Sequence, residues 1–163
     1  MASYATESIR AVALVGHGGS GKTSLAEALL FRAGAIPAKG TVEKGSTVCD
    51  FDPQEKTAGH SLNSALVNFA AEGVHIHLVD APGYPDFAGQ AFAALAGVDT
   101  AMIVINAQTG IELMTERMMR AARQRGLARM IVINKIDADN LDLPGLVAAI
   151  RERFGNECKL LDL

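Results

Sequence analysis

Residues 16–23, with the sequence GHGGSGKT, have the types and spacing best suited to chemistry in this chain. They match the pattern G-x-x-x-x-G-K-[ST], in which small residues let backbone N–H groups wrap around phosphate oxygens. An apolar stretch at residues 11–15 precedes this loop, and a helix is expected to begin at Lys22, adding its partial positive charge. Lys22 is then expected to reach the β and γ phosphates, and the Thr23 hydroxyl to bind Mg²⁺. The segment therefore predicts a phosphate-binding loop.

A second motif, DAPG, begins at Asp80 and follows the apolar stretch VHIHLVD. Open α/β sheets bind ligands at the carboxyl ends of their strands, so Asp80 suits the surroundings of a Mg²⁺ ion. Gly83 has no side chain to block its N–H from a γ phosphate, and loss of that phosphate would release the segment that follows. By itself the motif is weak, because a Pro-Gly turn after a strand is ordinary.

A third motif, NKID, follows the apolar stretch RMIVI and indicates the base. The Asp137 carboxylate can accept hydrogen bonds from N1–H and the exocyclic amine of guanine, whereas adenine offers no such donor pair. Asn134 is expected to contact the N7 and O6 edge, and the stem of Lys135 to cover the base. An ATP-using enzyme is therefore disfavoured. A turn without function is the alternative for this motif alone, but three ordered motifs at strand ends favour a guanine nucleotide site.

The elements that must position these motifs follow from the alternation of apolar runs and amphipathic stretches along the chain. AMIVIN and RMIVIN are too apolar for strands with one face exposed to solvent, so they predict strands buried on both faces. SALVNFA-AEG-VHIHLVD predicts a hairpin. We expect an α/β fold whose sheet is mostly parallel with one antiparallel hairpin strand. Residues 33–60 fit no element well and predict a long loop that is functional and disordered in turn.

Length and composition restrict the class of protein. The chain has 163 residues, of which 49% are hydrophobic and 20% charged, which is typical of one soluble globular domain. A net charge of -3 predicts no direct sequence-specific nucleic acid binding. The N-terminus lacks the apolar core of a signal peptide and no stretch is long enough to span a bilayer, so we expect a cytoplasmic protein without membrane contact. Cys49 and Cys158 match no redox or zinc spacing.

The segments GHGGSGKTSL, DAPGYPDF and NKID resemble the translational GTPases, and most closely the elongation factor G-like branch. The resemblance covers nearly the whole chain and implies the three-layer fold of P-loop NTPases, GTP and GDP as ligands, Mg²⁺ as cofactor, and the ribosome as a partner through the full-length protein. TVCDFDPQEKTAGHSL is similar to the first switch of that family, which ends in Gly-Ile-Thr. Ser61 takes the place of the threonine, as a candidate ligand of Mg²⁺ and the γ phosphate.

Several residues depart from the family pattern. Tyr84 stands where members generally carry a histidine that positions the attacking water. A phenol with a pKa near 10 can orient water but is neither a base nor a cation at pH 7, so hydrolysis is expected to be slower or differently triggered. Gly18 and Gly19 replace a bulky apolar residue and an aspartate. In these departures the chain resembles the divergent, second-copy elongation factor G-like proteins.

The expected site divides into three groups. Nucleotide contacts are assigned to Gly16, His17, Gly18, Gly19, Ser20, Gly21, Lys22, Thr23, Ser24, Asp80, Ala81, Pro82, Gly83, Tyr84, Asn134, Lys135 and Asp137. Catalytic roles are assigned to Lys22, Gly83 and Tyr84, and metal ligation to Thr23, Ser61 and Asp80. His17 is expected to pack the loop, and His75 and His77 to be structural, because no third metal ligand accompanies them.

Residues 1–163 are thus expected to form a GTP-binding domain truncated at its C-terminal end, because the family's last guanine-contacting loop, a short Ser-Ala motif, is missing after LLDL. Two functions remain open. The first is an enzyme that hydrolyses GTP on the ribosome. The second is a nucleotide-gated ribosome-binding module with weak or no hydrolysis, and Tyr84 is the residue that separates them.

Overall fold

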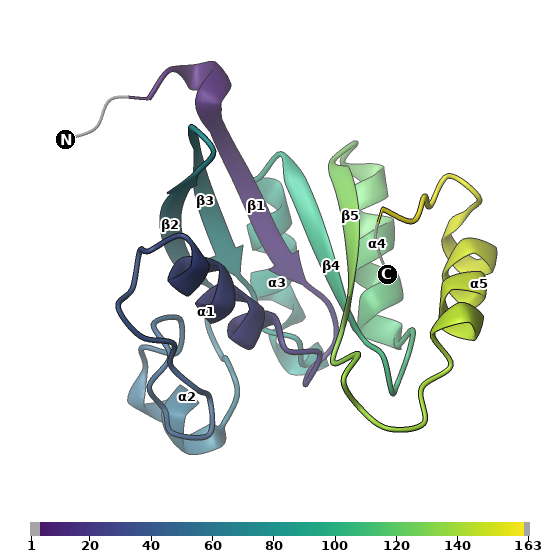
Figure 1. The fold of residues 1–163 in the computed structure, drawn as a ribbon, viewed down its shortest axis with the longest axis horizontal. Coiled ribbons are helices and arrows are strands. Elements are labelled where there is room, and N and C mark those ends of the chain that lie inside the picture. Colours follow the sequence, from purple (N-terminus) through teal and green to yellow (C-terminus); the bar gives the residue numbers. More distant parts are fainter. Residues whose placement is uncertain (1–3, 162–163) are drawn as a thin grey trace.

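The computed structural model describes residues 4–161; residues 1–3 and 162–163 of the expected domain lie outside the described residues. Its middle layer is a five-stranded sheet with the order β2-β3-β1-β4-β5 (Figure 1). The strands are β1 Ile9–Val15, β2 Ala65–Ala71, β3 Val74–Asp80, β4 Thr100–Asn106 and β5 Ala128–Asn134. The helices are α1 Lys22–Arg32, α2 Pro53–Ala58, α3 Ala88–Ala96, α4 Leu113–Gln124 and α5 Leu143–Phe154.

The pairing of the strands confirms the expected mixed sheet. β2 runs antiparallel to β3, and the pairs β1–β3, β1–β4 and β4–β5 are parallel. Glu72 and Gly73 join the hairpin strands with φ angles of 49° and 78°, the two positive values that suit a tight two-residue turn. The parallel strands all end at one edge of the sheet, so the loops that follow β1, β3, β4 and β5 meet there.

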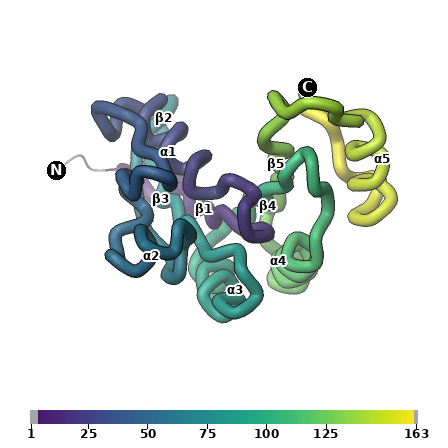
Figure 2. Tube along the Cα trace, turned by 90° about the horizontal axis from the view of Figure 1, so that it is seen from below, coloured from purple at the N-terminus to yellow at the C-terminus, as the bar shows by residue number. Residues whose placement is uncertain are grey.

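Helices cover both faces of the sheet. Figure 2 shows α3 and α4 on one face and α1 on the other. Ile103, Val104 and Ile105 of β4 are fully buried because both of their faces are covered, which explains the continuous β-branched run. Met118 and Met119 of α4 fill the core beneath the sheet, as its amphipathic pattern predicts. The α/β fold with three layers is thus confirmed.

The segment between α1 and β2 differs from the sequence expectation. The sequence predicts no element within residues 33–60, but Pro53–Ala58 form the short helix α2. Asp52 caps this helix, since its carboxylate accepts from Gln54 N at 2.8 Å while Glu55 Oε2 accepts from Asp52 N at 3.1 Å. The D-P-Q-E sequence is a capping box with proline at the first helical position, a local signal that offsets the absence of an apolar stripe.

Candidate nucleotide-binding site

The phosphate loop follows β1 and leads directly into α1. Gly16, Gly19 and Gly21 have φ angles of 143°, 76° and 90°, which residues with a side chain rarely adopt. A Cβ at Gly16 would overlap the Val104 carbonyl. No side chain of the described residues caps α1, so the first N–H groups of the helix remain directed at the loop. The loop therefore has the backbone geometry that an anionic ligand needs.

Lys22 is buried within this loop, with only 6% of its surface exposed. Its ammonium donates to the carbonyl oxygens of His17 at 2.8 Å and Gly16 at 3.3 Å. Burial lowers the pKa of Lys22 to about 8, and the nearby Asp80 carboxylate opposes that shift. A Cβ at Gly83 would overlap the Lys22 ammonium, so the second motif passes beside Lys22 with no room for a side chain. The first two motifs thus meet at this lysine.

Three oxygen-bearing side chains gather next to Lys22. The Thr23 hydroxyl donates to Asp80 Oδ2 at 2.7 Å and lies 3.3 Å from the Ser61 hydroxyl. Burial raises the pKa of Asp80 to about 6, and its Oδ1 is buried with no hydrogen-bond partner within residues 4–161. Two hydroxyls and a carboxylate oxygen that lacks such a partner are hard donors of the kind that Mg²⁺ takes. The residues present therefore fit this cation.

The NKID motif is tied to the predicted phosphate loop. The Asn134 amide donates to Ser20 O at 2.9 Å, across 114 residues of sequence. Lys135 has a φ of 61°, and its Cε lies 3.8 Å from the place of a Cβ at Gly21, so its stem extends along the loop. Asp137 is exposed to solvent. The structure thus gives the Asn134 amide a bond to the loop that the sequence analysis did not foresee.

His17 packs the loop against the start of α4. It is 2% exposed, and its Nδ1 lies 3.0 Å from the Thr115 hydroxyl. Its Nε2 lies 3.3 Å from both the Glu112 carboxylate and the Thr109 hydroxyl. Burial lowers the pKa of His17, while Glu112 acts in the opposite direction. These contacts agree with the packing role expected from the sequence.

Sequence reasoning missed three buried carboxylates that organise the segment before β2. Glu27 of α1 accepts from Gly40 N at 2.8 Å and from Val48 N. Asp50 accepts from the Ser61 hydroxyl at 2.8 Å. Glu55 accepts from Leu62 N and Asn63 N, both at 2.9 Å. In the sequence, the feature that could have indicated them is an acidic residue inside an otherwise apolar or helical stretch.

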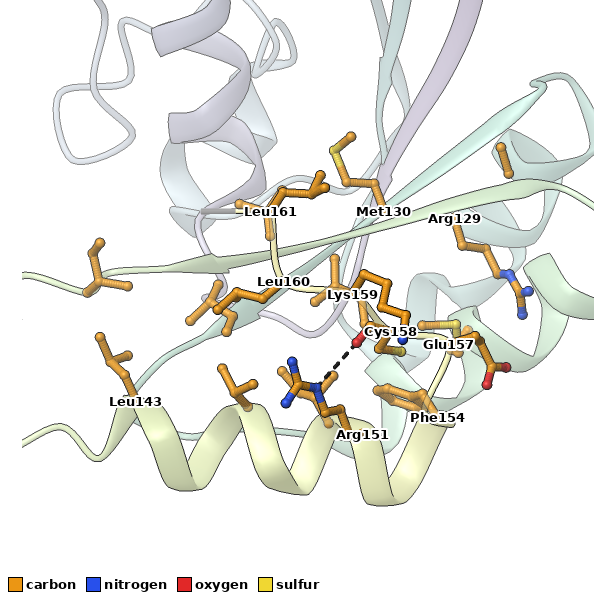
Figure 3. A pocket seen from close by; sticks show the side chains of 18 of the residues that line it. Arg129, Met130, Leu143, Arg151, Phe154, Glu157, Cys158, Lys159, Leu160 and Leu161 are labelled. Atoms are coloured by element: carbon orange, nitrogen blue, oxygen red, sulfur yellow. Dashed lines mark hydrogen bonds between the residues drawn. The ribbon is translucent and has the colours of Figure 1, made fainter. Parts of the chain in front are cut away.

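A separate apolar groove of about 680 Å³ lies between β5 and α5 (Figure 3). Met130, Leu143 and Phe154 line it together with Leu160 and Leu161, where the chain returns from α5. Its lining within residues 4–161 includes no residue of the phosphate loop or of the Asp80 motif. Ile136 of the NKID motif also lines it, so the groove lies apart from the phosphate loop but borders the third motif.

Three further observations concern the histidines, the cysteines and the helices. His75 and His77 contact each other in an edge-on arrangement, and residues 4–161 contain no group of three potential metal-binding side chains around them. Cys49 and Cys158 are free thiols. None of the helices described between residues 4 and 161 is long and apolar enough to cross a membrane.

Comparisons with known proteins found a matching family and several relatives. Residues 7–161 match the family described as "Elongation factor Tu GTP binding domain". The chain is 38% identical over 149 residues to an elongation factor G-like protein of Mycobacterium tuberculosis, covering 91% of this chain and 21% of that protein. It is 38% identical over 146 residues to elongation factor G 2 of Streptomyces coelicolor, covering 90% and 21%. The chain thus spans about a fifth of the length of the curated relatives it matches.

A crystal structure of a Thermus thermophilus protein has the same fold. It superposes with a TM-score of 0.87 at 40% sequence identity, covering 90% of this chain and 22% of that one.

Proposed function

The chain belongs to the family of the elongation factor Tu GTP-binding domain, and on this premise we propose that residues 1–163 form the GTP-binding and GTP-hydrolysing part of an elongation factor G-like translation factor. The relatives and the sheet support a translational GTPase. Dependence on Mg²⁺, action on the ribosome and a cytoplasmic location are the further parts of this proposal. We propose that the full-length protein, of which these residues are a part, binds the ribosome.

The observation that carries the proposal is the convergence of three motifs from separate strands. Thr23 after β1 bonds Asp80 at the end of β3, at 2.7 Å. Asn134 at the end of β5 bonds Ser20 of the phosphate loop, at 2.9 Å. These two bonds join a phosphate site, a cation site and a base site into one surface at the carboxyl edge of the sheet. A guanine nucleotide with its metal ion is the ligand that needs all three.

The phosphates are held by the loop and by Lys22. Backbone N–H groups of the loop and of the first turn of α1 bind the phosphate oxygens. The Lys22 ammonium, which otherwise bonds two loop carbonyls, exchanges them for the β and γ phosphates. Thr23, Ser61 and Asp80 would hold Mg²⁺ through their oxygen atoms. When bound, Mg²⁺ neutralises charge on the β and γ phosphate oxygens.

The base is selected by Asp137, whose carboxylate accepts from two guanine N–H groups. Lys135 covers one side of the base with its stem. Adenine leaves the carboxylate without donors, so ATP is rejected.

Hydrolysis proceeds by in-line attack of water on the γ phosphorus. The new bond from the water oxygen forms as the bond to the β–γ bridging oxygen breaks, giving GDP and phosphate. Lys22 and the Gly83 N–H stabilise the charge, and Tyr84 orients the water. A neutral phenol supplies no charge, and this favours the second candidate, a nucleotide-gated ribosome-binding module that hydrolyses GTP weakly or not at all.

Binding of GTP tests the proposal directly. In the complete gene product, Lys22→Ala is expected to weaken GTP binding by about 100-fold or more, because a buried charge partner of the phosphates is lost. Lys39→Ala, an exposed lysine outside the loop, is the matched control and should bind as the native protein does. Isothermal titration calorimetry with GTP and with ATP measures the affinity of each variant for both nucleotides. Unchanged binding by Lys22→Ala, or equal binding of ATP, would contradict the assignment.

Turnover separates the two candidate functions. GTP hydrolysis is measured with and without ribosomes for the native protein and for Tyr84→His. Strong stimulation of the native protein identifies a GTPase in which Tyr84 substitutes for histidine. Tight GTP binding without native turnover, restored by Tyr84→His, identifies the nucleotide-gated binding module.

A further inference from the structure

Glu27 of α1 is a buried carboxylate that connects this helix to the segment before β2. Its side chain is 0% exposed. Its Oε2 accepts from Gly40 N at 2.8 Å, and its Oε1 accepts from Val48 N. The salt bridges found within residues 4–161 do not include Glu27, so two backbone N–H groups hold it in place of a cation. Hydrogen bonds to a carboxylate are stronger than neutral ones, so both contacts tie the segment firmly to α1.

The segment that Glu27 anchors leads to Ser61. Next to Val48, the Thr47 hydroxyl donates to Asp50 Oδ2 at 2.7 Å. Asp50 Oδ1 in turn accepts from the Ser61 hydroxyl at 2.8 Å. Because the Ser61 proton is directed at Asp50, the lone pairs of the Ser61 oxygen are left for a cation. The place of that oxygen is therefore set, through Asp50, by the part of the segment that Glu27 anchors.

These contacts form a ring that begins and ends on α1. Thr23 lies four residues before Glu27, on the same face of the helix. The Thr23 hydroxyl is 3.3 Å from that of Ser61. One helix thus carries a proposed cation ligand and also the anchor that brings Ser61 to it. Loss of the anchor would move Ser61 away from Thr23 while leaving the phosphate loop in place.

We infer that Glu27 is a positioning residue through which the site distinguishes GTP from GDP. The inference rests on the proposed function, in which Ser61 serves the cation and the γ phosphate, whereas the loop also binds phosphates that GDP keeps. Glu27 holds Ser61 near its bound position before the nucleotide arrives. GTP then loses little binding free energy to ordering the segment, and GDP gains nothing from that order. Glu27 itself is assigned no contact with the nucleotide or the cation.

The affinities for GDP and for a GTP analogue that is not hydrolysed test this inference, in the complete gene product with Mg²⁺. Glu27→Ala is expected to weaken binding of the analogue about tenfold, because the closed segment becomes a minority state, and to leave GDP affinity within about twofold. Leu95→Ala removes a buried side chain of α3, on the opposite face of the sheet from α1 (Figure 2). This variant controls for a general loss of stability and should leave the ratio of the two affinities unchanged.

Ser61→Ala shows whether Glu27 acts through Ser61. In this background the hydroxyl that Glu27 positions is absent, so adding Glu27→Ala should not weaken binding of the analogue further. Glu27→Gln keeps one acceptor oxygen for the two N–H groups, and its affinity should lie between those of the native protein and Glu27→Ala. An effect of Glu27→Ala that adds in full to that of Ser61→Ala would overturn the positioning role.

Alkylation of Cys49 tests the anchor without nucleotide. Cys49 directly follows Val48 and is 2% exposed, and burial raises the pKa of its thiol, so it should react slowly in the native protein. Glu27→Ala should speed its reaction with iodoacetamide at least about tenfold, because the segment opens more easily without its acceptor. Peptide mass spectrometry measures the rate at Cys49, and Cys158 is the internal reference whose rate should not change.

The outcomes separate the inference from the proposed function. Selective weakening of the GTP analogue that Ser61→Ala abolishes, together with faster alkylation of Cys49, supports the inference. Equal weakening of both nucleotides, or an unchanged alkylation rate, overturns it and leaves the nucleotide site standing. Failure of the native protein to bind either nucleotide overturns the proposed function itself and with it the role of Glu27 in distinguishing GTP from GDP.

Discussion

Two buried charged groups, Lys22 and Asp80, dominate the electrostatics of the site at the scale of single residues. Burial lowers the pKa of Lys22 to about 8 and raises that of Asp80 to about 6, so in both cases it shifts the equilibrium toward the neutral form, although both groups are still mostly charged at pH 7. An anionic phosphate beside the ammonium and a cation beside the carboxylate would each stabilise the charged form. A metal-bound nucleotide at the proposed site would therefore oppose both pKa shifts.

A pH dependence is expected from His17. Burial holds the pKa of this imidazole below its ordinary value of 6.5. As the pH falls, His17 therefore takes up a proton in the unfolded chain at a higher pH than in the folded protein. The free energy of unfolding should decrease as the pH falls below about 6.5. In His17→Asn this part of the pH dependence should disappear, which calorimetric melting at pH 7.5 and 5.5 without nucleotide would measure.

Several groups face His17 and set the size of this effect. Glu112, Thr109 and Thr115 contact the ring, and the charges of Lys22 and Lys135 lower its pKa further. His77→Asn on β3 is the control for a histidine outside the phosphate loop. An identical pH dependence of native protein and His17→Asn would contradict the prediction.

At the scale of elements, the segment between α1 and β2 is held by buried carboxylates as well as by the apolar contacts of Ile36 and Cys49. Glu27 fixes two points of the segment through Gly40 N and Val48 N. Asp50 holds the Ser61 hydroxyl, and Glu55 holds the backbone just beyond it. Each buried carboxylate accepts hydrogen bonds from backbone N–H or hydroxyl groups that would otherwise be buried without a partner. The position of Ser61 therefore depends on carboxylates that the sequence analysis did not assign to the site.

Glu27→Ala is expected to release this segment. Removing a buried acceptor of two backbone N–H groups should lower the free energy of unfolding by about 2–4 kcal/mol. Urea denaturation measures the loss, and limited proteolysis should show faster cleavage between residues 39 and 48. Glu43→Ala changes an exposed glutamate of the same segment and should stay within about 0.5 kcal/mol of the native protein. Equal effects of the two variants would contradict this role of Glu27.

At the scale of the whole molecule, β5 forms one edge of the sheet, with an apolar groove beside it. Within residues 4–161 it pairs only with β4, and its outer backbone groups have no neighbouring strand. Met130 on this strand is 42% exposed and lines the groove. Edge strands with apolar side chains are templates for pairing with other chains. The chain of 163 residues is therefore expected to associate through this edge.

Met130→Lys should reduce that association, because a charge on an edge strand opposes pairing. Sedimentation velocity over a range of concentrations measures it. Leu66→Lys is the matched control, since Leu66 lies on β2 at the opposite edge and is 67% exposed. Association that survives Met130→Lys, or that Leu66→Lys abolishes equally, would contradict an interface at β5.

The sequence by itself determined the fold class, the hairpin and the three motifs. Each of these is a local pattern: glycines and a lysine in one loop, alternation along one hairpin, or an aspartate at the end of an apolar run. Parallel strands end at one edge, so local patterns at the ends of β1, β3 and β5 were enough to predict one site. The roles of the individual site residues remain predictions.

Only the tertiary structure decided which distant residues support that site. Asn134 bonds Ser20 across 114 residues, and His17 bonds Thr115 across 98. Tyr84, which follows β3, likewise lies against Gly18 after β1 and His60 before β2. Such contacts depend on how strands are ordered and how helices pack on them, and no pattern in a short stretch of sequence records that order. Function-bearing motifs are local in sequence here, whereas the contacts that hold them in place are not.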